Sequence, residues 1–140
     1  MTAALVDQFR GWLLRPRIVH RLPGRLRLRL PQLARLDRAG QDWSFAWRGL
    51  FAGAPEIQSV EANPTTGSVL IRYRPDELTE AELVAFLEAV NRFALRRFDR
   101  LAAVPPVELP EAVRRLVNEI RARTRRRLAF DDSPEAAADV

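Results

Sequence analysis

The chain has 140 residues, 47% of them hydrophobic, and a formal net charge of +5. This length and composition support one domain with a buried core and argue against extensive disorder. The absence of cysteine excludes disulfides, thiolate zinc sites, iron–sulfur clusters and thiol nucleophiles.

All 23 basic residues are arginines. The codon bias of a GC-rich bacterial genome explains this choice, but guanidinium groups also suit anionic partners, because they match carboxylates and phosphates. No apolar run approaches the roughly 20 residues of a membrane-spanning helix, and the amino terminus lacks a signal-peptide core. We therefore expect a cytoplasmic protein, which could still be peripheral to a membrane or compartment.

Residues 1–16 are predicted to contain an N-terminal amphipathic helix. Apolar side chains recur there at helical spacing, namely Leu5, Phe9, Trp12 and Leu13. This helix could cover the core, dock on a partner or lie on a membrane surface.

A period of two residues begins after Arg17. Arginine and leucine alternate over residues 25–30, which predicts a half-buried strand with Arg25, Arg27 and Arg29 on its open face. Residues 18–22 are interpreted as an earlier strand segment. The Pro23-Gly24 pair between the two segments predicts a bulge, a bend or a tight turn.

A helix with one apolar stripe is predicted between Pro31 and about Ala52, with Gly40 as a possible interruption. Glycine and proline at residues 53–55 end it. Its stripe consists of Leu33, Leu36, Trp43, Trp47, Leu50 and Phe51.

Residues 57–73 are predicted to form a β-hairpin. Pro64 fixes φ in the turn and Gly67 can adopt a positive φ. The returning strand is expected to bury one face, which consists of Val69, Ile71 and Tyr73.

The next helix is expected to begin at Thr79. Glu82 would complete a capping box with Thr79, and Leu78 and Leu83 would form a hydrophobic staple. Further along, the chain either prolongs this helix or forms a short fourth strand at residues 101–104.

The C-terminal segment, residues 105–130, is predicted to be a linker followed by a basic helix with Pro110 in its first turn. The end of this helix carries Arg121, Arg123, Arg125, Arg126 and Arg127. Such a cluster is either a solvated helix end or a binding site for a phosphate-rich partner, nucleic acid or anionic lipid. The acidic, alanine-rich residues 131–140 are predicted to be a disordered tail.

The order of strands and helices predicts an α+β fold of the ferredoxin-like βαββα(β) sandwich type over residues 17–104, with added N- and C-terminal helices. Helices would cover one face of the antiparallel sheet. The opposite face, which carries the three arginines of the first strand, would be open to water.

Two segments, IQSVEANPTTGSVLIRY (57–73) and LTEAEL (78–83), resemble the second half of heavy-metal-associated (HMA) domains. The first strand resembles a cysteine-free branch of that superfamily that has a His-x-x-Pro-Gly-Arg-x-Arg stretch. The matching residues are His20, Pro23, Gly24, Arg25 and Arg27. Metal-binding HMA domains hold Cu(I) or Zn(II) with a Cys-x-x-Cys loop; the corresponding residues 30–36 contain no sulfur, histidine or carboxylate.

The resemblance implies a non-catalytic adaptor or regulatory module in metal homeostasis, with iron among the candidate metals. Its partner would be a protein such as a P-type metal ATPase or a component of an iron-storage compartment. Binding is expected through Arg25, Arg27 and Arg29 together with His20. No cofactor and no enzymatic activity are expected, because catalytic motifs and phosphate-binding loops are missing from the sequence.

Several alternatives remain at this level. The arginine face could simply be solvated, and His20 could have a hydrogen-bonded structural role at the strand bend. A nucleic-acid-binding protein could use both arginine clusters, although RNA recognition on such a sheet normally needs exposed aromatic residues. An iron-binding module could use His20 or carboxylates, and a homo-oligomer is also open.

Overall fold

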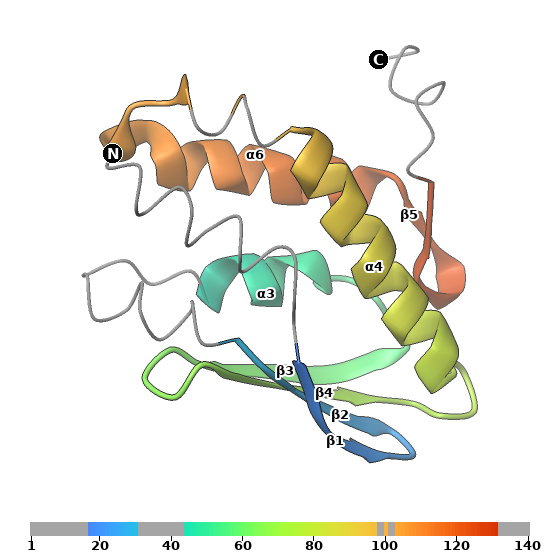
Figure 1. The fold of residues 1–140 in the computed structure, drawn as a ribbon. Coiled ribbons are helices and arrows are strands. Elements are labelled where there is room, and N and C mark those ends of the chain that lie inside the picture. Colours follow the sequence, from blue (N-terminus) through green and yellow to red (C-terminus); the bar gives the residue numbers. More distant parts are fainter. Residues whose placement is uncertain (1–16, 31–43, 98–99, 101–102, 132–140) are drawn as a thin grey trace.

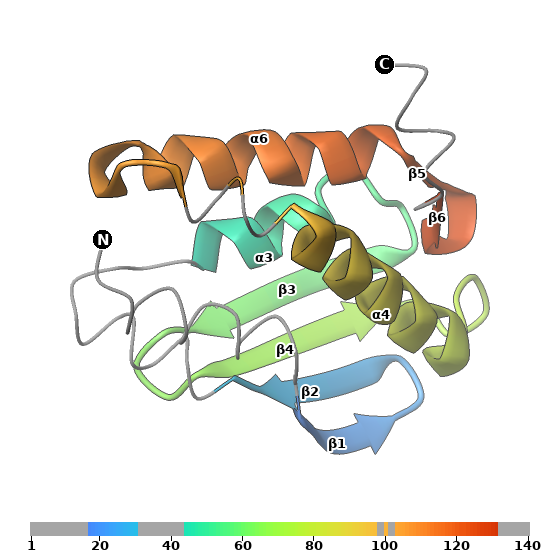
Figure 2. The ribbon, with the colours of Figure 1, turned by 45° about the horizontal axis from the view of Figure 1, so that its top comes forward.

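The computed structural model describes residues 17–30, 44–97, 100 and 103–131. These residues form an α+β structure in which helices cover one face of a four-stranded antiparallel sheet (Figure 1). A second view shows helix α6 lying over α3, on the side of α3 away from the sheet (Figure 2). The predicted helix at 1–16, the 31–43 part of the predicted helix at 31–52, and residues 132–140 of the tail lie outside the described residues.

The sheet has the strand order β1-β2-β4-β3, and every neighbouring pair is antiparallel. Its strands are β1 (Arg17–Leu22), β2 (Arg25–Arg29), β3 (Ile57–Asn63) and β4 (Ser68–Tyr73). The helices are α3 (Ser44–Leu50), α4 (Glu80–Arg96) and α6 (Leu109–Ala122), with a 3₁₀ turn at Pro106–Glu108 before α6. A short hairpin of β5 (Thr124–Arg125) and β6 (Ala129–Phe130) ends the described chain, with a 3₁₀ turn at Arg126–Leu128 between its strands.

The Pro23-Gly24 pair forms the tight turn between β1 and β2. Gly24 has a φ of +78°, and a Cβ atom at this position would lie 2.9 Å from the Tyr73 carbonyl oxygen. Glycine is therefore required both by the backbone conformation and by the close approach of β4. The hairpin makes β1 the fourth strand of the sheet.

In the described part of residues 101–104, where a short fourth strand was one alternative, there is no strand. Ala103 is helical and Val104 lies in a bend, whereas Leu101 and Ala102 lie outside the described residues. The sheet edge next to β2 is taken by β1, because a hairpin partner only two residues away in sequence closes a much shorter loop than a distant strand.

The predicted β3–β4 hairpin is confirmed. Its turn is closed by a 2.9 Å hydrogen bond from the Gly67 N–H to the Asn63 carbonyl, with Gly67 at a φ of +75°. Val69, Ile71 and Tyr73 are at most 2% exposed and face the helices, as expected.

The start of α4 is also confirmed. The Glu82 N–H donates to the Thr79 hydroxyl at 3.1 Å, and the Thr79 N–H donates to the Glu82 carboxylate at 2.9 Å. Leu78 and Leu83 are fully buried on either side of this capping box. Local sequence therefore fixes where α4 begins.

The predicted basic helix is shorter than expected, because α6 ends at Ala122. The Thr124 hydroxyl donates to the Ile120 carbonyl at 2.7 Å, and the chain then turns back as the β5–β6 hairpin. Leu128 is 2% exposed, and the Phe130 ring lies 5.2 Å from the Phe93 ring of α4. Burial of Leu128 and partial burial of Phe130 outweigh the high helix propensity of the arginine run.

Candidate functional site

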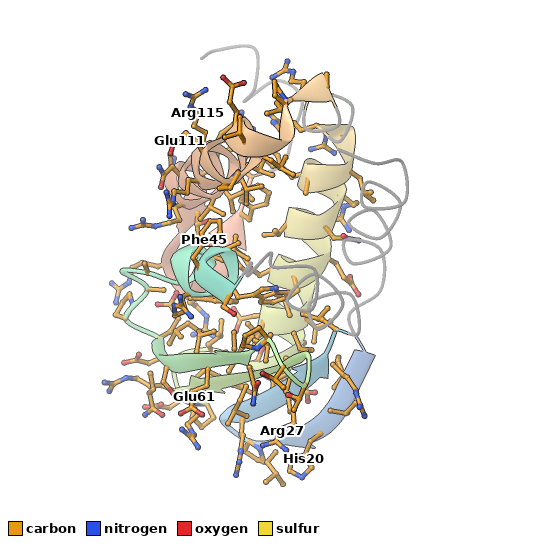
Figure 3. All side chains as sticks on the ribbon, turned by 90° about the vertical axis from the view of Figure 1, so that its left-hand side faces the viewer. His20, Arg27, Phe45, Glu61, Glu111 and Arg115 are labelled. Carbon is orange, nitrogen blue, oxygen red and sulfur yellow. The ribbon has the colours of Figure 1, made fainter. Side chains whose placement is uncertain are left out.

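The side of the sheet away from the helices carries the predicted arginine face, which we call the open sheet face. Directly opposite residues on paired strands share one face of a sheet. The register aligns His20, Arg27, Leu70 and Glu61 in one row across β1, β2, β4 and β3. Figure 3 shows His20, Arg27 and Glu61 on the side opposite the helices.

The alternation in β2 is confirmed by burial. Leu26 and Leu28 are fully buried, whereas Arg27 and Arg29 are exposed and Arg25 is half-buried. The same polypeptide segment therefore anchors the core and presents the guanidinium groups. Because β2 is an inner strand, paired with β1 and β4, these groups stand on a rigid part of the fold.

The charge of this face is only partly neutralised. Arg72 on β4 forms an ion pair with Glu61 at 2.8 Å. Arg27 and Arg29 form no ion pair with any described residue. Arg25 lies directly opposite Arg72, a like-charge pairing that destabilises an antiparallel sheet.

Apolar contact area accompanies these charges. Leu70 is only 5% exposed although its register partners are Arg27 and Glu61 on the open sheet face. The aliphatic stems of long neighbouring side chains can cover such a residue while their charged ends stay in water. At the β1 edge, Val19 and Leu22 are each 50% exposed.

His20 lies in β1, directly opposite Arg27. Its side chain is exposed and makes no hydrogen bond to any described residue. The described residues therefore give no support to the alternative of a hydrogen-bonded structural histidine at the strand bend. The structure brings His20 into the same surface as the three arginines.

The five C-terminal arginines are not one exposed helix end, because the chain leaves the helix at Ala122 and their side chains separate. Arg123 is 8% exposed and lies with Arg97 over the Phe93 ring, at 4.8 and 3.5 Å from the ring centroid. Both guanidinium groups approach Glu119, at 3.4 Å from Arg123 and 2.9 Å from Arg97. Arg123 is therefore a structural residue that sequence reasoning placed in a binding cluster.

Arg127 is also engaged. Its Nε donates to Glu82 Oε2 at 2.8 Å and its terminal nitrogen donates to Oε1 at 2.6 Å. These hydrogen bonds and the Thr79 N–H lower the pKa of Glu82 from 4.5 to about 2, and the same carboxylate raises the pKa of Arg127. The ion pair fastens the C-terminal hairpin to the start of α4.

A second carboxylate holds the same hairpin. Glu56 is 4% exposed, and its Oε1 accepts a 3.2 Å hydrogen bond from the Leu128 N–H. Arg127 and Leu128 both have positive φ, at 59° and 52°. Such conformations are unfavourable for residues other than glycine, and the two carboxylates together with Leu128 burial offset that cost.

The remaining members, Arg121, Arg125 and Arg126, line a hollow with the loop at residues 52–56. Nothing in the sequence signals this juxtaposition, because the two segments are about 70 residues apart. The ion pair of Arg72 and Glu61, by contrast, lies within the β3–β4 hairpin that the sequence predicts.

Among the described residues, no three histidine, cysteine, aspartate or glutamate side chains gather into a possible metal site. Of residues 30–36, which the sequence analysis compared with a metal-binding loop, only Leu30 is described. No helix in the described part of the chain has the length and apolar character to cross a membrane.

Comparison of the chain with protein-family models, with curated proteins and with solved structures finds no match. The function proposed below is therefore inferred from the geometry of the open sheet face.

Proposed function

We propose that this chain is a non-catalytic adaptor that receives an acidic segment of a protein partner on its open sheet face. The observation that carries the proposal is the pair of exposed guanidinium groups of Arg27 and Arg29, which no described carboxylate neutralises. They stand on a strand whose other face is fully buried. Charge complementarity therefore selects an acidic occupant.

A protein segment suits this face better than a nucleic acid. The aromatic residue of the sheet strands, Tyr73, is 2% exposed and faces the core, so it cannot stack on bases. Leu22, which lies opposite Arg25 and is 50% exposed, would instead match an apolar side chain that alternates with acidic ones.

Docking on the face is favoured over strand addition at the sheet edges. The β1–β2 pairing has a register shift between Ile18 and His20, and the β3–β4 pairing has one between Ile57 and Ser59. Such irregularities interrupt the hydrogen-bonding edge that an added strand needs.

The role in metal homeostasis rests on the resemblance to cysteine-free HMA domains. The order β2-α3-β3-β4-α4 supports a ferredoxin-like βαββα unit, with β1 in the place of the usual fourth strand. Within this proposal the partner is a metal-transport ATPase or a component of an iron-storage compartment, bound without a thiolate metal site.

The test is an NMR titration with an extended model peptide in which glutamate alternates with valine. We expect chemical-shift changes confined to β1, β2 and β4. The variant Arg27→Gln/Arg29→Gln should weaken binding about tenfold or more, because hydrogen bonds to charged groups contribute ~1.5–3 kcal/mol each. Arg25 is left unchanged because its Nε is buried.

The matched control is Arg48→Gln/Arg115→Gln, which removes the same charge from exposed positions on α3 and α6. This control should bind within about twofold of the parent protein, since distant surface charges act only through screened long-range attraction. Equal losses of peptide affinity in the Arg27/Arg29 variant and in this control would refute a defined site on the open sheet face. Tighter binding of single-stranded RNA, with a steep salt dependence that the Arg27/Arg29 variant reduces, would favour the nucleic-acid alternative.

A further inference from the structure

A second basic site lies between the loop after α3 and the C-terminal hairpin. It is a hollow of about 310 Å³. Its wall combines three arginines (Arg121, Arg125 and Arg126) with the loop at residues 52–56. Leu50 and Leu128 contribute apolar surface.

The guanidinium groups of this hollow are largely unsatisfied. Arg125 donates to the Ala122 carbonyl at 3.1 Å. The guanidinium groups of Arg121 and Arg126 have no hydrogen bond or ion pair with any described residue. Arg121 lies in the last turn of α6, whereas Arg125 and Arg126 belong to the C-terminal hairpin.

The acidic residue at this place, Glu56, lines the hollow and sets one negative charge against its three arginines, so the lining keeps a net positive charge. Its carboxylate is 4% exposed, and one oxygen accepts the Leu128 N–H. Both oxygens of the Glu82 carboxylate accept hydrogen bonds from Arg127. The two carboxylates near the hairpin are thus directed to Leu128 and Arg127.

The loop lies beside Arg121. A Cβ atom at Gly53 would lie 3.8 Å from a terminal nitrogen of Arg121, which is an ordinary contact distance. Glycine is favoured here by its φ of +81°, a backbone conformation that disfavours other residues. Arg121 from α6 and Arg126 from the hairpin line one hollow with this loop.

We propose that this hollow binds a phosphate monoester group. Planar guanidinium donors match phosphate oxygens in geometry and charge. A volume of about 310 Å³ also leaves room for a small group attached to the phosphate, at the lower end of ligand pockets in general. The site is distinct from the open sheet face and does not depend on the function proposed for it.

The test is titration of the full chain with inorganic phosphate and with glycerol 3-phosphate, followed by NMR. Saturable shifts are expected at residues 52–56 and 121–128. The single variants Arg121→Gln and Arg126→Gln should each weaken binding about tenfold, whereas Arg115→Gln, an exposed arginine on the same helix, should weaken it less than twofold. Thermal unfolding of each variant establishes that it is folded.

A charge-preserving variant separates a shaped site from diffuse attraction. Ala52 is exposed and lines the hollow, so Ala52→Leu narrows it while all arginines remain, and it should weaken binding several-fold. The proposal is overturned if neither phosphate compound gives saturable shifts, if Arg115→Gln loses as much affinity as Arg126→Gln, or if Ala52→Leu binds normally.

The source of the phosphate is resolved by a second arm with phosphatidylcholine vesicles that contain phosphatidic acid. Binding to these vesicles that needs Arg126 but not Arg115 assigns the site to a lipid headgroup. Binding of glycerol 3-phosphate without vesicle binding assigns it to a soluble phosphate monoester. Vesicle binding that all the variants retain, with no binding of the soluble compounds, would refute the site.

Discussion

The arginines of β2 and those at the C-terminus are chemically identical but have different surroundings. On β2, Arg27 and Arg29 point away from the core and meet no described carboxylate. At the C-terminus, Arg123 lies over the Phe93 ring and Arg127 holds Glu82 with two hydrogen bonds. The comparison teaches that an arginine cluster in a sequence is available for binding only where the fold leaves its guanidinium groups unsatisfied.

The largest expected effect concerns the ring beneath the structural arginines. Phe93 is fully buried, and its replacement by alanine should lower the free energy of unfolding by ~3–5 kcal/mol, through lost burial and a cavity. Urea denaturation measures this change. Val107→Ala, at an 88% exposed position, serves as the control and should change stability by less than ~0.5 kcal/mol. Similar values for both variants would contradict the structural role.

The next largest loss of stability is expected at Glu119, which accepts hydrogen bonds from both Arg97 and Arg123. Glu119→Gln removes a negative charge beside two guanidinium groups whose side chains are 15% and 9% exposed. We expect a loss of ~1–3 kcal/mol, because buried donors lose a charged acceptor. The exposed pair of Arg72 and Glu61 provides the matched control, since Glu61→Gln should cost less than ~1 kcal/mol. An equal loss of unfolding free energy in Glu119→Gln and Glu61→Gln would contradict the expectation that the more buried ion pairs contribute more to stability.

A pH-dependent effect distinguishes the Arg127–Glu82 ion pair from the unpaired arginines. The pKa of Glu82 in the folded chain, about 2, lies below its ordinary value of 4.5. Its contribution to stability is therefore fully present above about pH 4.5 and is lost as the pH falls toward 2. The stability difference between the parent protein and Arg127→Gln, measured by urea denaturation, should shrink over this range. A constant difference from pH 6 to pH 2 would exclude the ion pair as its cause.

The smallest effect is expected on the open sheet face. Arg27→Gln/Arg29→Gln should change the free energy of unfolding by less than ~0.5 kcal/mol, because neither side chain has a described partner to lose. Thermal or urea denaturation tests this. A destabilisation as large as that of Glu119→Gln would show that these arginines support the fold, and would remove the reason to regard the face as a binding surface.

The sequence predicted correctly those features whose stabilising contacts join residues close together in the chain. The alternation of β2, the Asn63–Gly67 turn and the Thr79 capping box depend on residues a few positions apart, and all three are confirmed. The C-terminal hairpin was missed because it is held by Glu56 and Glu82, from distant elements. A run of arginines alone favours helix, and only packing against α4 reverses that preference.

The sequence by itself determined the period-two pattern that places guanidinium groups on one side of β2 and leucines on the other, since strand geometry allows no alternative. It also excluded every thiolate site through the absence of cysteine. The tertiary structure decided which arginines are satisfied. Arg97 and Arg127 meet carboxylates 22 and 45 residues away in the chain, and Arg123 lies over the ring of Phe93 in helix α4. Local spacing carries no information about such distant partners.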